Sequence, residues 1–146
     1  GTGSGYAAAV LAEMGAAVVT AERDPDLAST ARSRLDALGD SQVEVVRGDG
    51  STGRPERAPF DAITVAAAAP SVPEPLVAQL RVGGRLVVPV GDRRSGQNLF
   101  RVVRTGEGNE VEDLLPVTFV PLVGRAGWSD SQTGSRRGAL RRNHPR

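Results

Sequence analysis

The chain has 146 residues, a length that fits one domain. Hydrophobic residues make up 39% of the chain, which is enough for a packed core. Only 3% of the residues are aromatic, so the core must consist of Ala, Val, Leu and Ile. There is no cysteine and a single histidine, His144, so disulfides, thiolate metal sites and histidine metal clusters are excluded, and a reducing cytoplasm is a compatible location. The net charge is +1, but residues 131–146 hold five arginines and no acid, and the first 130 residues hold 13 arginines against 17 acids (net −4), so no global nucleic-acid-binding surface is expected.

The first third of the chain alternates between helical and strand patterns. No apolar run approaches the roughly 18 residues of a membrane span, and no signal peptide is visible. Residues 6–14 are rich in Ala and Leu and predict a short helix, and the β-branched run 17–21 predicts a buried strand. Residues 25–38 predict a second helix, with the apolar face Leu27, Ala31, Leu35 and Leu38, the N-cap Asp24 and the C-cap Gly39.

The middle of the chain continues the alternation. We expect strands at 43–47, 60–66 and 85–90, a loop rich in Gly, Ser and Pro at 48–59, a helix at 74–80 and a turn at Gly83 and Gly84.

The last part of the chain changes pattern. Residues 99–105 and 110–119 read as two strands around a Gly-rich turn, which predicts an antiparallel hairpin at the edge of the sheet. Strand–helix alternation before it predicts an α/β fold with a parallel sheet covered by helices. Residues 129–146 are rich in Ser, Gly, Arg and Asn without periodicity, so we interpret them as a disordered tail after a domain at 1–128.

The chain opens on a glycine-rich turn, G-x-G-x-G, followed directly by a helix. Glycines let the backbone approach a ligand closely, and the free N–H groups of a helix start favour a carboxylate or phosphate. In the dinucleotide fingerprint the third small residue falls one place later, where this sequence has Tyr6. We expect the Tyr6 ring to obstruct close helix–strand packing, which disfavours a nicotinamide cofactor; an ordinary tight turn is the alternative for this motif alone.

Two acids follow predicted strands at the same edge of the sheet. Glu22 lies 17 residues beyond Gly5, close to the spacing of roughly 20 at which an acid binds ribose hydroxyls. Asp49 lies between two glycines after strand 43–47, where it could accept a hydrogen bond from an adenine amino group. Ligands of open α/β sheets bind beyond the carboxyl ends of the strands, so the turn and both acids predict a nucleoside site. A solvated acid and a common Asp-Gly turn are the alternatives.

With these segments in order, the sequence resembles the protein-L-isoaspartate O-methyltransferase family. The resemblance rests on GTGSGYAAAVLAEMGA, VVTAERDP, VEVVRGDGSTG, APFDAITVAAAAPSVPEPL, LRVGGRLVVPVG and EDLLPVTFVPLVGRAGW, which cover nearly all of residues 1–128. It implies a Rossmann-like fold of class I methyltransferases that use S-adenosylmethionine, and methyl transfer to the carboxylate of isoaspartyl and D-aspartyl residues in damaged proteins.

The resemblance also assigns site residues. It implies that the cofactor is bound by Gly1, Thr2, Gly3, Ser4, Gly5, Glu22, Arg23, Asp49, Gly50 and Ala66. The substrate candidates are Ala67, Ala68, Pro70, Leu122 and Val123. We expect damaged proteins and peptides as partners, no specific nucleic acid, no membrane and a monomer.

The resemblance further implies parts that precede the Gly turn. Family members have an N-terminal helical region, a loop with the active-site serine and a central strand that ends in an acid, so we expect this chain to be an N-terminally truncated form without a catalytic residue of its own. The missing strand would lie next to residues 17–21 and leave an apolar edge unpaired. The alternatives are a catalytically inactive fragment of such an enzyme and a nucleotide-binding oxidoreductase domain.

Overall fold

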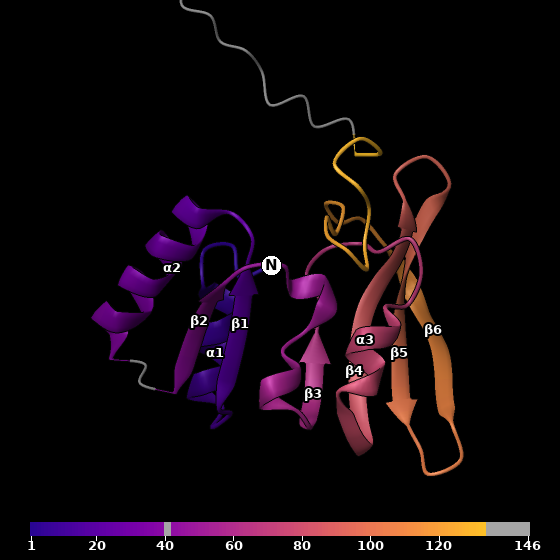
Figure 1. Ribbon diagram of the computed structural model, residues 1–146, viewed down its shortest axis with the longest axis horizontal. Helices are drawn as coiled ribbons and strands as arrows, with labels where there is room; N and C mark the ends of the chain where they lie inside the picture. Colours follow the sequence, from indigo (N-terminus) through magenta and orange to yellow (C-terminus); the bar gives the residue numbers. More distant parts are fainter. Residues whose placement is uncertain (40–41, 134–146) are drawn as a thin grey trace, which may run out of the picture.

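A computed structural model gives the architecture and describes residues 1–39 and 42–133 (Figure 1). Its helices and strands in chain order are α1 (Tyr6–Glu13), β1 (Val18–Glu22), α2 (Pro25–Leu38), β2 (Val43–Arg47), β3 (Phe60–Thr64), α3 (Glu74–Ala78), β4 (Leu80–Asp92), β5 (Gly96–Arg104) and β6 (Asn109–Val117). Two short 3-10 helices, η1 (Gly50–Thr52) and η2 (Pro55–Arg57), lie in the connection between β2 and β3.

The strands form two sheets. In the first sheet β1 pairs with β2 in parallel, and the second has the order β3-β4-β5-β6, with a parallel β3–β4 pair followed by two antiparallel pairs. Within the described residues β1 and β3 are not paired with each other, although they are neighbours in Figure 1. The arrows of β1, β2, β3 and β4 point the same way, so their carboxyl ends share one edge of the molecule. This edge is where α/β folds bind ligands.

Local sequence signals explain α2. The Asp24 carboxylate accepts hydrogen bonds from the backbone N–H groups of Asp26 (2.9 Å) and Leu27 (3.1 Å), and Gly39 ends the helix in the left-handed conformation. These contacts satisfy backbone groups that a helix end leaves free. The predicted bounds of this helix are therefore confirmed.

The apolar face of α2 is narrower than predicted. Ala28, Ala31 and Leu35 are buried, whereas Leu27 and Leu38 are exposed, Leu38 to 68%. Leu35 and Ala28 pack with Val45 of β2 in a small core, and a larger core lies around β4. The larger core holds Ala67, Ala69, Leu76, Val77, Leu80, Leu86, Val88, Val102 and Leu122. Helical spacing alone did not distinguish the central residues of the stripe from those at its margins.

The predicted turn at Gly83 and Gly84 is wrong. Both glycines lie inside β4, at an irregularity where Phe60 pairs with Leu80 but Ala62 already pairs with Arg85. The extra residues on β4 form a bulge that keeps the strand continuous over 13 residues. The helix before it ends at Ala78 rather than at residue 80.

The structure also describes residues 129–133, which fall within the predicted tail. Residues 129–133 form a turn in which the backbone N–H of Gln132 and the Thr133 hydroxyl donate hydrogen bonds to the carbonyls of Ser129 and Asp130. The remainder of the predicted Arg-rich tail, residues 134–146, lies outside the described residues. Among the described residues no helix is long and apolar enough to span a membrane.

Candidate functional site

The Gly turn lies between the carboxyl ends of β1 and β3, where Figure 1 marks the first residue. The Thr2 backbone N–H donates to the Ala21 carbonyl (3.2 Å), and the Thr2 hydroxyl lies 2.7 Å from that of Thr20. On the other side, a Cβ at Gly1 would lie 3.9 Å from the Ala66 carbonyl oxygen. The turn therefore spans the space between β1 and β3. The predicted cofactor residue Glu22 lies next to it on the β1 side, and Ala66 lies next to it on the β3 side.

Gly3 leaves one side of this turn open. Its φ of +56° is in the left-handed region, and a Cβ built on it would have no heavy atom within 4 Å. A ligand can therefore approach the backbone closely at this point. The next residues begin α1, whose N-terminus has no capping carboxylate or amide of its own. Its free N–H groups are suited to a ligand carboxylate.

Glu22 connects the turn to the strand edge. Its side chain is only 8% exposed, and its two carboxylate oxygens accept hydrogen bonds from the backbone N–H groups of Gly3 and Asp24, both at 3.0 Å. Its backbone carbonyl accepts from the Gly48 N–H (2.8 Å), which joins β1 to the loop after β2. A carboxylate has about four acceptor positions, so each oxygen retains one for a further donor such as a ribose hydroxyl.

The Asp49 carboxylate accepts hydrogen bonds from two parts of the chain, at Ser51 and at Arg125. One carboxylate oxygen accepts from the Ser51 backbone N–H (2.9 Å) and hydroxyl (2.7 Å), and the other accepts from the Arg125 backbone N–H (2.8 Å). Burial opposes ionisation of Asp49, but the hydrogen bonds from Arg125 and Ser51 and the nearby Arg23 charge outweigh it and lower its pKa. Beyond its predicted place at the adenine, Asp49 thus attaches the loop at 120–128 to the end of β2.

Two further residues, Ser51 and Gly124, complete this attachment. Ser51 is fully buried, and its hydroxyl also accepts a hydrogen bond from the Ala126 N–H (3.0 Å). Gly124 packs directly on the pair, since a Cβ there would fall 2.2 Å from the Asp49 carboxylate and 2.5 Å from the Ser51 hydroxyl. An Asp-x-Ser turn signal exists in the sequence, whereas only the family resemblance implies that residues 120–128 fold back near this site.

A third contact joins the last described segment to the site. The Arg23 guanidinium donates to both carboxylate oxygens of Asp130, each at 2.8 Å, and both side chains are exposed. Arg23 directly follows Glu22, so the pair lies beside the predicted ribose position. Asp130 lies in the segment predicted as a disordered tail, so this contact was not expected from the sequence.

The substrate candidates fall into two groups. Ala67, Ala68 and Leu122 are buried, and Ala68 uses its backbone in the fold: its N–H donates to Val120, and its carbonyl accepts from the Leu122 N–H and the Trp128 indole. Pro70 is exposed and Val123 is half-buried. The carbonyl that bonds Ala68 belongs to Val120, whose side chain is 57% exposed. Pro70 and Val120 are therefore accessible positions in this part of the chain.

The predicted obstruction by the Tyr6 ring is wrong. The Tyr6 side chain is 76% exposed and does not lie against a strand, so it does not obstruct helix–strand packing. It lines a pocket of about 250 Å³ between α1 and α2, together with Ser4, Ala9, Arg34 and Leu38. Tyr6 therefore gives no packing reason against a nicotinamide cofactor, and the comparisons below decide the class.

The α/β order of the elements, the Gly turn and the buried acid after β1 define a class I methyltransferase fold, and solved structures agree. A protein-L-isoaspartate O-methyltransferase structure matches with a TM-score of 0.81 and 32% identity, over 87% of this chain and 41% of that one. A Plasmodium falciparum protein described as a β-aspartate methyltransferase, in complex with S-adenosyl-L-homocysteine, matches with a TM-score of 0.67 and 27% identity, over 84% and 63%.

The sequence comparisons define the family. The model of the protein-L-isoaspartate(D-aspartate) O-methyltransferase family matches residues 1–127, and the chain belongs to this family. Protein-L-isoaspartate O-methyltransferase 2 of Pelobacter propionicus is 57% identical over 129 residues, which are 88% of this chain and 57% of that protein. The Brucella anthropi enzyme is 50% identical over 131 residues, 89% of this chain and 60% of its own length. The chain thus spans less than two thirds of the length of these relatives.

Proposed function

We propose that this chain provides the cofactor-binding part of an enzyme that transfers a methyl group from S-adenosylmethionine to isoaspartyl and D-aspartyl carboxylates in damaged proteins, which initiates their repair. Family membership supports the reaction, because the relatives are named for it. One observation of the structure carries the cofactor part: the buried Glu22 carboxylate holds the Gly3 N–H at 3.0 Å while the other side of Gly3 stays open.

The residues fit the different parts of such a cofactor. The Gly turn and the N-terminus of α1 offer backbone N–H donors to a carboxylate, as on the methionine part. Glu22 offers acceptor positions to ribose hydroxyls. Asp49 and Gly50, at the end of β2, would lie at the adenine, with Asp49 held in place by Ser51 and Arg125.

The chemistry requires little of the protein beyond binding and alignment. When bound, S-adenosylmethionine would supply a methyl group on a cationic sulfur, and this sulfur is a good leaving group. The accepting carboxylate has a pKa near ~4 and is already ionised at neutral pH, so it needs no general base. Holding two reactants in line can supply roughly 7–11 kcal/mol of the barrier. The chain's part is to hold the cofactor at β1 and β2, with Pro70 and Val120 as accessible positions for the peptide.

Other properties stay predictions from the sequence. The mildly acidic body of the chain predicts no specific nucleic-acid binding. We also expect a monomer and a cytoplasmic location, with which the lack of cysteine is compatible. Sedimentation of the purified chain would test the monomeric state, and cell fractionation the location.

A methyl-transfer assay tests the proposed reaction. The chain is incubated with S-adenosylmethionine labelled in the methyl group and an isoaspartyl peptide, with the matching aspartyl peptide as control. We expect base-labile methyl ester on the isoaspartyl peptide alone. Equal labelling of both peptides would contradict the substrate, and no ester would support the alternative of an inactive fragment.

A further inference from the structure

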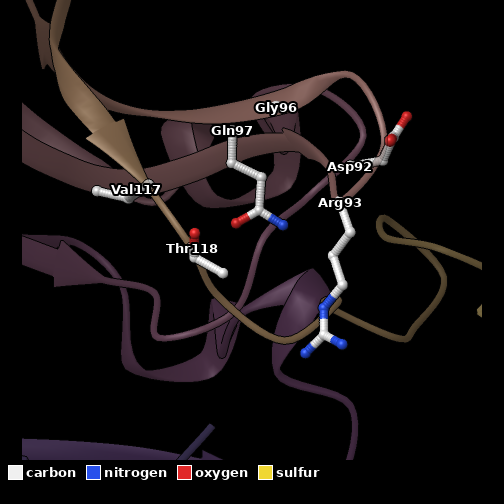
Figure 2. A pocket seen from close by; sticks show the side chains of 6 residues that line it. All are labelled: Asp92, Arg93, Gly96, Gln97, Val117 and Thr118. Carbon is white, nitrogen blue, oxygen red and sulfur yellow. The ribbon is translucent and has the colours of Figure 1, made fainter.

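A second pocket lies on the same edge of the molecule, at the turn between β4 and β5 (Figure 2). It has a volume of about 410 Å³ and is lined by Asp92, Arg93, Gly96, Gln97, Val117 and Thr118. None of these residues belongs to the site described above. The pocket is lined by three separate segments, namely the end of β4, the start of β5 and the end of β6.

One wall of this pocket is rigidly built. The Gln97 side chain is buried, and its amide oxygen accepts from the Phe119 N–H (2.6 Å) while its amide nitrogen donates to the Phe119 carbonyl (3.1 Å). These two bonds continue the pairing of β5 with the chain beyond the end of β6. They hold Thr118, which lies between Val117 and Phe119, at the rim of the pocket.

Arg93 supplies the positive charge of the pocket, which Asp92 also lines. Asp92 is turned away into the β4–β5 turn, where its carboxylate accepts from the N–H groups of Arg94 (2.6 Å) and Ser95 (2.9 Å) and from the Ser95 hydroxyl (2.8 Å). Figure 2 shows Arg93, Gln97 and Thr118 on one side of this turn and the Asp92 carboxylate on the other. In the part of the chain that the structure describes, no ion pair includes Arg93.

The segment 66–70 links the pocket to the cofactor site. At one end, Ala66 lies beside Gly1. At the other end, Ala69 bridges to Val90, and its carbonyl accepts from the N–H of Gly91 (2.9 Å), the residue before Asp92. Ala66 and Ala69 are three residues apart, and an extended peptide rises about 3.3 Å per residue. Because residues 66 and 67 form a bend, an extended peptide that ran beside this segment would cover the distance from Ala66 to Ala69 in at most about three residues.

We propose that this pocket is a subsite for an acidic side chain of the protein substrate, located about three residues from the methylated residue and recognised by Arg93. The inference rests on the proposed function, because the position of the methylated residue depends on it. The ligand is a carboxylate, since Arg93 is cationic, while Gln97 already has its hydrogen bonds within the chain.

Matched isoaspartyl peptides test this subsite. They carry Glu, Gln or Lys three residues before or after the isoaspartyl residue in an otherwise alanine-rich sequence. An exposed ion pair changes the specificity constant by about two- to fivefold, so the Glu peptide should exceed the Gln peptide by that factor at low salt in one of the two positions. The preference should fall as salt is added.

Two neighbouring variants provide the control. Arg93→Gln should abolish the preference for the Glu peptide, whereas Arg94→Gln, which removes the same charge one residue away and outside the pocket lining, should retain it. Equal preference in Arg93→Gln and in the unchanged protein, or no preference in the unchanged protein at either position, would overturn the subsite.

A binding measurement separates this inference from the proposed reaction. Fluorescence anisotropy of labelled Glu and Gln peptides reports binding to the chain without methyl transfer. A difference that depends on Arg93 in the absence of any methyl ester would support the subsite and count against the activity of this chain. Methyl transfer without an Arg93-dependent difference in binding would support the activity of this chain and overturn the subsite.

Discussion

The Asp49 carboxylate accepts a hydrogen bond from the Arg125 backbone N–H at 2.8 Å, although the two residues are 76 positions apart in the chain. The bond joins the loop after β2 to the loop that follows β6. Because Asp49 also lies at the predicted adenine position, the same residue connects the cofactor site with the segment that ends at Trp128.

Removing the charge of Asp49 should therefore loosen this connection. In Asp49→Asn only one of the two side-chain positions is an oxygen that can accept, and the other is an NH2 group. Either the Ser51 N–H or the Arg125 N–H would therefore face this NH2 group, which is a donor. We expect a loss of about 1–3 kcal/mol in the free energy of unfolding, measured by urea titration. Asp61→Asn is the control, because the Asp61 side chain is 85% exposed and its surface ion pair with Arg81 should contribute little to stability. Equal small losses in both variants would contradict the role of Asp49.

The pH dependence of stability follows from the same contacts. The pKa of Asp49 is lowered from its ordinary value of 3.8, since the bonds from Arg125 and Ser51 outweigh the effect of burial. A lowered pKa means that the stabilisation is complete above the ordinary value and is lost as pH falls through the lowered one. The stability difference between the unchanged protein and Asp49→Asn should thus be constant from pH 7 to about 5 and shrink below about 4. A difference that grows on acidification would contradict this assignment.

Gly124 provides a steric test of the loop. In Gly124→Ala the new Cβ would overlap the Asp49 carboxylate and the Ser51 hydroxyl, so the loop must shift. We expect a destabilisation of about 1–3 kcal/mol, seen as a lower midpoint of thermal unfolding. Gly106→Ala is the matched control, because a Cβ at Gly106 has no heavy atom within 4 Å. Similar midpoints for the two variants would show that the loop does not pack as described.

Glu22 should be required for cofactor binding in addition to its contacts in the fold. Glu22→Gln removes the charge that accepts from Gly3 and Asp24 and would accept from ribose. We expect S-adenosylhomocysteine to bind at least about tenfold more weakly, since a hydrogen bond to a charged group contributes about 1.5–3 kcal/mol. The measurement is the rise in unfolding temperature that the ligand causes. Glu13→Gln, on the exposed side of α1, should keep that rise; the same rise in Glu22→Gln would remove Glu22 from the site.

Much of the fold could be predicted because local signals carry it. Asp24, Pro25 and Gly39 fix the ends of α2 through contacts within a few residues. β-branched runs gave the parallel strands, and the alternating order gave the α/β class. Gly83 and Gly84 were misread because two glycines suit a tight turn and a bulge within a strand equally well. The exposure of Leu27 and Leu38 depends on how far α2 packs over β2, which helical spacing does not determine.

The site was predictable where its residues follow strands and not where distant segments meet. Glu22 and the Gly turn are adjacent in the fold, as their places in the pattern indicated. The bonds from Asp49 to Arg125 and from Arg23 to Asp130 join segments 76 and 107 positions apart, and one of them uses a backbone group that has no sequence signature. The position of Val120 likewise depends on a contact between distant segments, namely the hydrogen bond from the Ala68 N–H to its carbonyl.

Calorimetric titration of S-adenosylhomocysteine into the 146-residue chain tests the central claim most directly, because it depends on the site at β1 and β2 and not on a complete enzyme. We predict saturable binding of one ligand per chain with a dissociation constant in the micromolar range, and no saturable heat with NADH. Absence of saturable heat with S-adenosylhomocysteine, or saturation by NADH instead, would contradict a methyl-donor site formed by the Gly turn and Glu22.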